Sequence, residues 1–101
     1  MSSGRLLIVE DDAVFARTLA RSFERRGYAV EAVHGPDTLE EVARCFAPDH
    51  AVVDLRLGGG ASGLTCVRQL HALDPAMRIV VLTGFASIAT AVEAIKLGAT
   101  N

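Results

Sequence analysis

Short apolar runs alternate with amphipathic stretches along the whole chain, and this alternation constrains the fold more than any other feature. Four runs rich in branched aliphatic residues have the length of buried strands: residues 5–9, 28–33, 51–54 and 78–82. The stretches between them place apolar side chains three or four residues apart, as helices do. Strands that alternate with helices through short links predict one α/β domain, with a parallel sheet covered by helices on both faces.

Capping residues and apolar spacing set the expected helix boundaries. Asp12 can cap a first helix, in which Phe15, Leu19 and Phe23 lie at helical spacing and which Gly27 ends. The same signals predict three more helices, with these boundaries: Pro36 to about residue 46, the end of a glycine-rich loop (residues 58–63) to Pro75, and Ser87 to Gly98.

Composition and charge narrow the classes of protein to consider. The chain has 101 residues, half of them apolar, which suits one small globular domain. Its formal net charge of −2 gives no general attraction to nucleic acid, so a DNA-binding role needs a further segment. Cys45 and Cys66 belong to no metal-binding spacing, and we expect two buried thiols. No apolar run approaches the roughly 18 residues of a membrane span, and no signal peptide is recognisable, so we expect a cytoplasmic protein without a membrane partner.

Polar residues follow three of the predicted strands directly. Glu10 and Asp11 come after the first strand, Asp54 ends the third, and Thr83 with Gly84 follows the fourth. Open parallel sheets bind ligands beyond the carboxyl ends of their strands. If the first, third and fourth strands are neighbours, these side chains converge on one place.

Several carboxylates so close together repel one another unless a cation holds them. Oxygen ligands favour a hard ion, and Mg²⁺ takes a few carboxylates together with waters and phosphate oxygens. Asp54, alone at the end of an apolar strand, is the best candidate for a nucleophile toward a phosphoryl group. Glu10, Asp11 and Asp54, with the backbone carbonyl of Arg56, are the candidate metal ligands, and the Thr83 hydroxyl can stabilise charge on the transferring oxygens.

Each of these residues also has a plain structural interpretation. An acidic residue after a strand is often a helix N-cap, which is the better account of Asp12. Capping or solvation explains Glu10 and Asp11, taken alone, about as well as metal binding does. Thr83 alone fits a turn. The case for a site therefore rests on the coincidence of three strand ends.

Three segments, in order, resemble those of the receiver domains of two-component response regulators. LLIVEDD is similar to their first strand and acidic pair, AVVDLRL to the third strand with its phosphoacceptor, and IVVLTG to the fourth strand with its hydroxyl residue. The resemblance covers essentially the whole chain. It implies a flavodoxin-like (CheY-like) three-layer α/β/α fold with strand order 2-1-3-4-5.

The resemblance also implies a function. A sensor histidine kinase would transfer a phosphoryl group to Asp54 with Mg²⁺ bound, and Thr83 and Gly84 would contact that group in a switch. Such a domain signals and is not an enzyme beyond its own Mg²⁺-dependent phosphotransfer and dephosphorylation. VVDLRLG and TGFASIATAVEAIKLGAT further resemble the redox-responsive regulators of the RegA, PrrA and ActR kind. That resemblance implies a transcriptional regulator that contacts DNA through an output domain.

The sequence departs from the family in two places. Gly63 lies one position later than the family pattern, which leaves open how closely the loop after Asp54 covers the site. The family's fifth strand, its phosphoryl-pairing lysine and the fifth helix are missing after GATN, and Lys96, in the predicted fourth helix, is no replacement. We therefore expect residues 1–101 to be a receiver domain incomplete at its C-terminus, with strand order 2-1-3-4. The exposed edge of strand 78–82 would then allow self-association.

Three alternative functions compete with this interpretation. Gly58, Gly60 and Gly63 satisfy GxGxxG, but the next strand ends without the acidic residue that a dinucleotide-binding domain uses for the ribose. A phosphatase with an aspartate nucleophile needs a second acid two residues later, where this chain has Arg56. A degenerate receiver that only binds partners is the remaining alternative.

Overall fold

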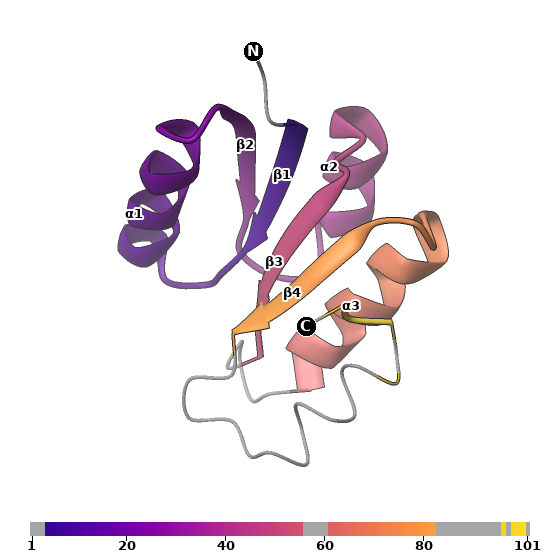
Figure 1. The fold of residues 1–101 in the computed structure, drawn as a ribbon. Coiled ribbons are helices and arrows are strands. Elements are labelled where there is room, and N and C mark those ends of the chain that lie inside the picture. Colours follow the sequence, from indigo (N-terminus) through magenta and orange to yellow (C-terminus); the bar gives the residue numbers. More distant parts are fainter. Residues whose placement is uncertain (1–3, 56–60, 83–95, 97, 101) are drawn as a thin grey trace.

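The structure is a computed structural model that describes residues 4–55, 61–82, 96 and 98–100, and its centre is one parallel sheet (Figure 1). The sheet consists of β1 (Gly4–Val9), β2 (Tyr28–Val33), β3 (His50–Asp54) and β4 (Arg78–Leu82). Within the described ranges the strand order is β2-β1-β3-β4, and all three pairings are parallel. The predicted order 2-1-3-4 is confirmed.

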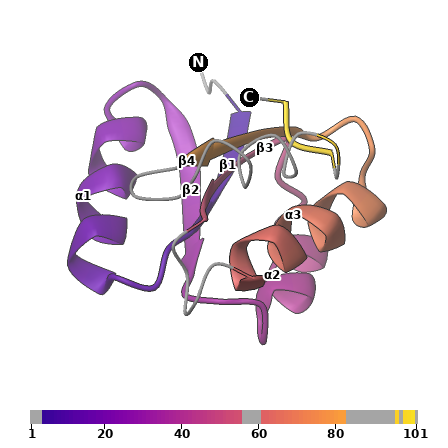
Figure 2. The same cartoon turned by 90° about the horizontal axis from the view of Figure 1, so that it is seen from below.

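Helices cover both faces of this sheet and complete the predicted three layers. They are α1 (Ala13–Glu24), α2 (Leu39–Phe46) and α3 (Ala61–Leu73). Figure 2 shows α1 on one side of the strands, and α2 with α3 on the other. The fourth predicted helix lies outside the described residues apart from its last part, in which Lys96 is helical and Gly98 has a φ of 128°.

Helix α1 begins where the sequence predicts, because Asp12 caps it. The Asp12 side chain accepts hydrogen bonds from the backbone N–H groups of Val14 and Phe15, at 3.0 and 3.1 Å. Gly27 has the positive φ expected of it, 95°, but the helix already ends at Glu24. Phe15 is 37% exposed. The buried side of the helix is centred on Ala16, with Leu19, Ala20 and Phe23 around it.

Gly63 lies in the first turn of α3, whereas the sequence placed it at the end of the preceding loop. Its buried Cα packs against the end of β3. A Cβ at this position would lie 2.7 Å from the Leu55 Cα and 3.0 Å from the Asp54 carbonyl oxygen. The close approach of helix and strand therefore explains the glycine.

The core divides between the two faces of the sheet. The larger part lies under α2 and α3 and includes Leu7, Val53, Val67 and Leu70; the smaller part lies under α1. Cys66 is buried in the larger part, and burial raises the pKa of its thiol to about 11.

Cys45 is exposed on α2, so the prediction of two buried thiols is wrong for this residue. Ala43 and Val42 pack in the larger core, whereas Cys45 lines an open hollow that it shares with Glu31 of β2. No helix in the described ranges has the length and apolar character needed to cross a membrane.

The outer edge of β4 is partly covered. The Thr100 N–H donates to the Ile79 carbonyl oxygen at 2.6 Å, and the Ile79 N–H donates to the Thr100 hydroxyl oxygen at 3.0 Å. Ala99 is buried in the larger core. Val80 is 39% exposed. The expected open edge is thus closed at Ile79, and self-association through the remainder stays a prediction.

Candidate functional site

Three carboxylates lie together at the carboxyl ends of the neighbouring strands β1 and β3. Ligand oxygens of Glu10, Asp11 and Asp54 all lie within 4.8 Å of one another. Glu10 and Asp54 are 1% and 2% exposed, while Asp11 is exposed to solvent. Because β1 and β3 pair in parallel up to Val9 and Val53, the residues that follow these two valines emerge side by side.

Backbone hydrogen bonds hold both strand ends in place. The Glu10 N–H donates to the Val33 carbonyl oxygen at 2.9 Å, which fixes the end of β1 against β2. The Leu55 N–H donates to the Leu82 carbonyl oxygen at 3.0 Å, which fixes the end of β3 against β4. Asp54 itself ends a strand whose preceding residues are buried, so little freedom remains in its backbone.

His34 is a supporting residue that the sequence did not reveal. Its Nδ1 lies 3.0 Å from the Glu10 carbonyl oxygen and, when protonated, donates a hydrogen bond to it. The contact joins residues 24 positions apart in the chain. Glu10 and His34 meet because β1 and β2 are neighbours in the sheet. The one feature of the sequence that could have indicated this role is the position of His34 directly after a predicted strand.

Burial and charge combine to make Glu10 unusual. Burial, and next the hydrogen bond with Asp54, raise the pKa of Glu10 from its ordinary value of 4.5 to about 7. One Glu10 oxygen accepts a long hydrogen bond, 3.4 Å, from the Asp12 N–H. The other, Oε1, is buried and finds no hydrogen-bond partner among the described residues. A buried oxygen of this kind beside two further carboxylates fits a hard divalent cation.

Other predicted site residues fall outside the described part of the chain. These are Arg56, Thr83 and Gly84, together with Gly58 and Gly60 of the glycine-rich loop. Gly63, the third glycine of the GxGxxG pattern, packs on the backbone of Leu55. Its role in helix–strand packing accounts for it without a bound dinucleotide.

Exposed apolar side chains follow the acidic residues Asp11 and Asp12 in the chain. Val14 is 69% exposed and Phe15 37% exposed, both in the first turn of α1. Asp11 and Asp12 immediately precede this turn. The first turn of α1 therefore presents apolar side chains to solvent directly after the acidic residues in the chain.

Comparison with known proteins identifies the class of this domain. A family model described as the response regulator receiver domain matches residues 6–101. The chain therefore belongs to the response regulator receiver family. Among solved structures, a response regulator protein from Burkholderia pseudomallei with a phosphorylated aspartic acid, calcium ion and citrate is similar, at 49% identity and a TM-score of 0.88. The match covers 96% of this chain and 56% of that one.

Curated relatives include regulators of the kind that the sequence resembles. The chain is 49% identical over 94 residues to the acid tolerance regulatory protein ActR of Sinorhizobium medicae, covering 93% of this chain and 48% of the relative. It is 46% identical over 96 residues to the photosynthetic apparatus regulatory protein RegA of Cereibacter sphaeroides, covering 95% and 52%. The predicted family resemblance is confirmed, and the chain spans about half the length of these relatives.

Proposed function

We propose that Asp54 is the phosphoacceptor of this receiver domain and that a histidine kinase supplies the phosphoryl group. The observation that carries the proposal is the placement of Asp54, Glu10 and Asp11 with ligand oxygens within 4.8 Å of one another. The phosphorylated aspartic acid of the similar Burkholderia protein supports it.

In the proposed reaction an Asp54 carboxylate oxygen attacks the phosphorus of a phosphohistidine. The new bond joins this oxygen to phosphorus, the phosphorus–nitrogen bond breaks, and its electron pair returns to the imidazole nitrogen. The product is an aspartyl phosphate, which water later hydrolyses to restore the carboxylate. The rigid end of β3 orients Asp54 for this attack, because the Leu55–Leu82 hydrogen bond holds the following residue.

Glu10, Asp11 and Asp54 would hold Mg²⁺, with the Arg56 carbonyl as a further ligand. When bound, the ion would neutralise charge on the phosphoryl oxygens. The Glu10 Oε1, which has no hydrogen-bond partner among the described residues, and the oxygen-only donor set support a hard cation here. The calcium ion of the Burkholderia structure is consistent with a divalent ion in that protein. Thr83 and Gly84 are proposed to contact the phosphoryl group.

We assign residues 1–101 to one receiver domain of a longer transcriptional regulator, in which an output domain would contact DNA. The support is the match over residues 6–101 and the roughly twofold greater length of ActR and RegA. The exposed Val14 and Phe15, which follow Asp11 and Asp12 in the chain, would offer the kinase an apolar contact surface. Apart from transfer to and from its own Asp54, the domain is proposed to have no catalytic activity.

The direct test is phosphorylation by a small phosphodonor. The purified chain is incubated with acetyl phosphate and Mg²⁺, and its intact mass is recorded beside that of an Asp54→Asn variant. We expect one phosphate adduct on the wild type, none on the variant, and loss of the adduct when EDTA replaces Mg²⁺. An Asp11→Asn variant should lower the yield while leaving the acceptor in place.

An adduct that persists in Asp54→Asn would contradict the assignment of the acceptor. A wild type that stays unmodified, also in a form extended to the length of the curated relatives, would favour a degenerate receiver that only binds partners.

A further inference from the structure

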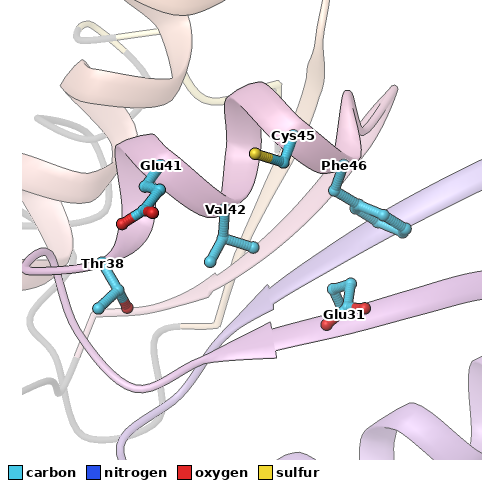
Figure 3. A pocket seen from close by; sticks show the side chains of 6 residues that line it. All are labelled: Glu31, Thr38, Glu41, Val42, Cys45 and Phe46. Carbon is cyan, nitrogen blue, oxygen red and sulfur yellow. The ribbon is translucent and has the colours of Figure 1, made fainter.

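A groove runs between the edge strand β2 and helix α2. It encloses about 510 Å³ and is lined by one residue of β2, by the N-cap of α2 and by four residues of that helix (Figure 3): Glu31, Thr38, Glu41, Val42, Cys45 and Phe46. An adjoining hollow of about 500 Å³ shares Thr38 and Val42 and extends the groove along β2 to Val33. Together the two hollows follow β2 from Glu31 to Val33.

Glu31 gives this groove an acidic edge. Its register partner in β1 is Leu7, a core residue beneath α2 and α3, so both project from the same face of the sheet. Glu31 is nevertheless exposed to solvent. Glu41 lines the groove from the helix. Among the described residues neither carboxylate forms an ion pair, whereas the nearby Glu40 is paired with Arg44 at 2.6 Å.

The outer edge of β2 carries backbone groups that pair with no other strand among the described residues. β2 is the outermost strand of the sheet in the described ranges, and its one strand partner there is β1. The Val33 carbonyl oxygen faces β1, where it accepts the Glu10 N–H. Since backbone groups alternate in direction along a strand, Val30 and Ala32 point their N–H and C=O groups outward. An edge of this kind is a template for another strand.

We propose that β2 and the groove bind an extended segment of another protein, in which a lysine or arginine lies between two aliphatic residues on one face. Its backbone pairs with Val30 and Ala32. Residues opposite each other on paired strands project to the same face, so the basic side chain reaches Glu31. The aliphatic side chains on either side pack on Val42 and Phe46.

A second copy of β2 does not meet this requirement. The strand reads YAVEAV and carries Glu31 on the groove face, so two copies would bring carboxylates together where a cation is needed. Two arginines of the described residues lie in strands: Arg5 in β1, which is paired on both sides, and Arg78 at the start of β4. Neither presents a basic side chain between two aliphatic strand residues on a free edge, so the proposed occupant is a different protein.

The test is an NMR titration of the ¹⁵N-labelled chain with a capped synthetic peptide. In this peptide two leucines flank one arginine on one face, and threonines occupy the other. We expect shifts confined to β2 and α2, and slower amide hydrogen exchange at Val30 and Ala32. Glu31→Lys should weaken binding at least about fivefold. Glu24→Lys, which reverses an exposed acid on α1, should leave it unchanged.

Any of these results of the titration would overturn the proposal: shifts that map elsewhere on the domain, equal affinity of the Glu31→Lys variant, or equal binding of a peptide with glutamate in place of arginine. Concentration-dependent shifts of β2 without peptide would identify a second copy as the occupant and would overturn it as well. Spectra of both variants without peptide confirm that each is folded.

Discussion

At the scale of single residues, the burial of Glu10 has two opposite effects: it favours cation binding and it destabilises the ionised carboxylate. Glu10 is buried beside Asp54, which suits a cation but penalises its own negative charge. The raised pKa, about 7, expresses this penalty in the metal-free protein. A carboxyl whose pKa is higher in the folded than in the unfolded state stabilises the fold most below its unfolded pKa. That contribution is lost as pH rises through the folded pKa.

Glu10→Gln should therefore stabilise the metal-free domain at pH 8 and change it little at pH 4.5. The gain at pH 8 should be at most about 3.5 kcal/mol, because the pKa rises from 4.5 to about 7 and one pKa unit corresponds to about 1.4 kcal/mol. Urea unfolding in EDTA at both pH values measures it, with Glu24→Gln as the exposed control. A difference from wild type that is the same at both pH values would show that Glu10 titrates normally.

Gly63 is a second residue whose surroundings matter, because they leave no room for a side chain. Alanine improves helix propensity by about 1 kcal/mol relative to glycine, but here its Cβ would lie 2.7 Å from the Leu55 backbone. We expect Gly63→Ala to destabilise the domain by about 1–3 kcal/mol, because the helix must move away from β3. Gly35→Ala is the matched control, since a Cβ there meets nothing within 4 Å. Urea midpoints of the two variants that coincide would contradict this account.

At the scale of elements, the beginnings of α1 and α2 differ in a way that can be measured. Asp12 caps α1 with two hydrogen bonds, whereas Thr38 at the start of α2 makes no side-chain capping bond. Asp12→Ala should lower the free energy of unfolding by about 1 kcal/mol, and Thr38→Ala by clearly less. Chemical denaturation at pH 5 compares them. Equal losses would mean that helix propensity, not capping, governs both positions.

The same elements show what could be predicted from the sequence. Branched aliphatic runs predicted all four strands because a parallel strand is buried on both faces. The cap of α1 was predicted because Asp12 bonds to residues next to it in the chain. The buried side of α1 was predicted in part: Leu19 and Phe23 pack under the helix as expected, whereas Phe15 is 37% exposed and Ala16 is buried instead.

The acidic site was likewise predicted from the sequence only in part. The convergence of Glu10 and Asp54 follows from strand order, which the alternation of elements and the family pattern together supply. The His34 contact with Glu10 and the packing of Gly63 on Leu55 depend on distances between elements. No local pattern encodes those distances. The exposure of Cys45 likewise depends on the angle at which the short α2 lies on the sheet.

At the scale of the whole molecule, the carboxylates couple cation binding to the stability of the domain. They come from two strand ends, β1 and β3, that are held together only in the folded chain. An ion that binds the folded form alone stabilises it by mass action. Its binding must also displace the proton that Glu10 carries below about pH 7.

We therefore expect Mg²⁺ to raise the thermal midpoint, and to raise it more at pH 8 than at pH 6. At ten times the dissociation constant, binding adds about 1.4 kcal/mol, which shifts the midpoint of a domain of this size by roughly 5–10 °C. Differential scanning fluorimetry with Mg²⁺, with EDTA, and with NaCl at equal ionic strength separates specific binding from screening. Asp11→Asn should reduce the Mg²⁺ shift and leave the NaCl shift unchanged, since Asp11 is exposed and contributes to the cluster chiefly as a ligand. A Mg²⁺ shift no larger than that of NaCl would mean that the three carboxylates, although close together, hold no cation.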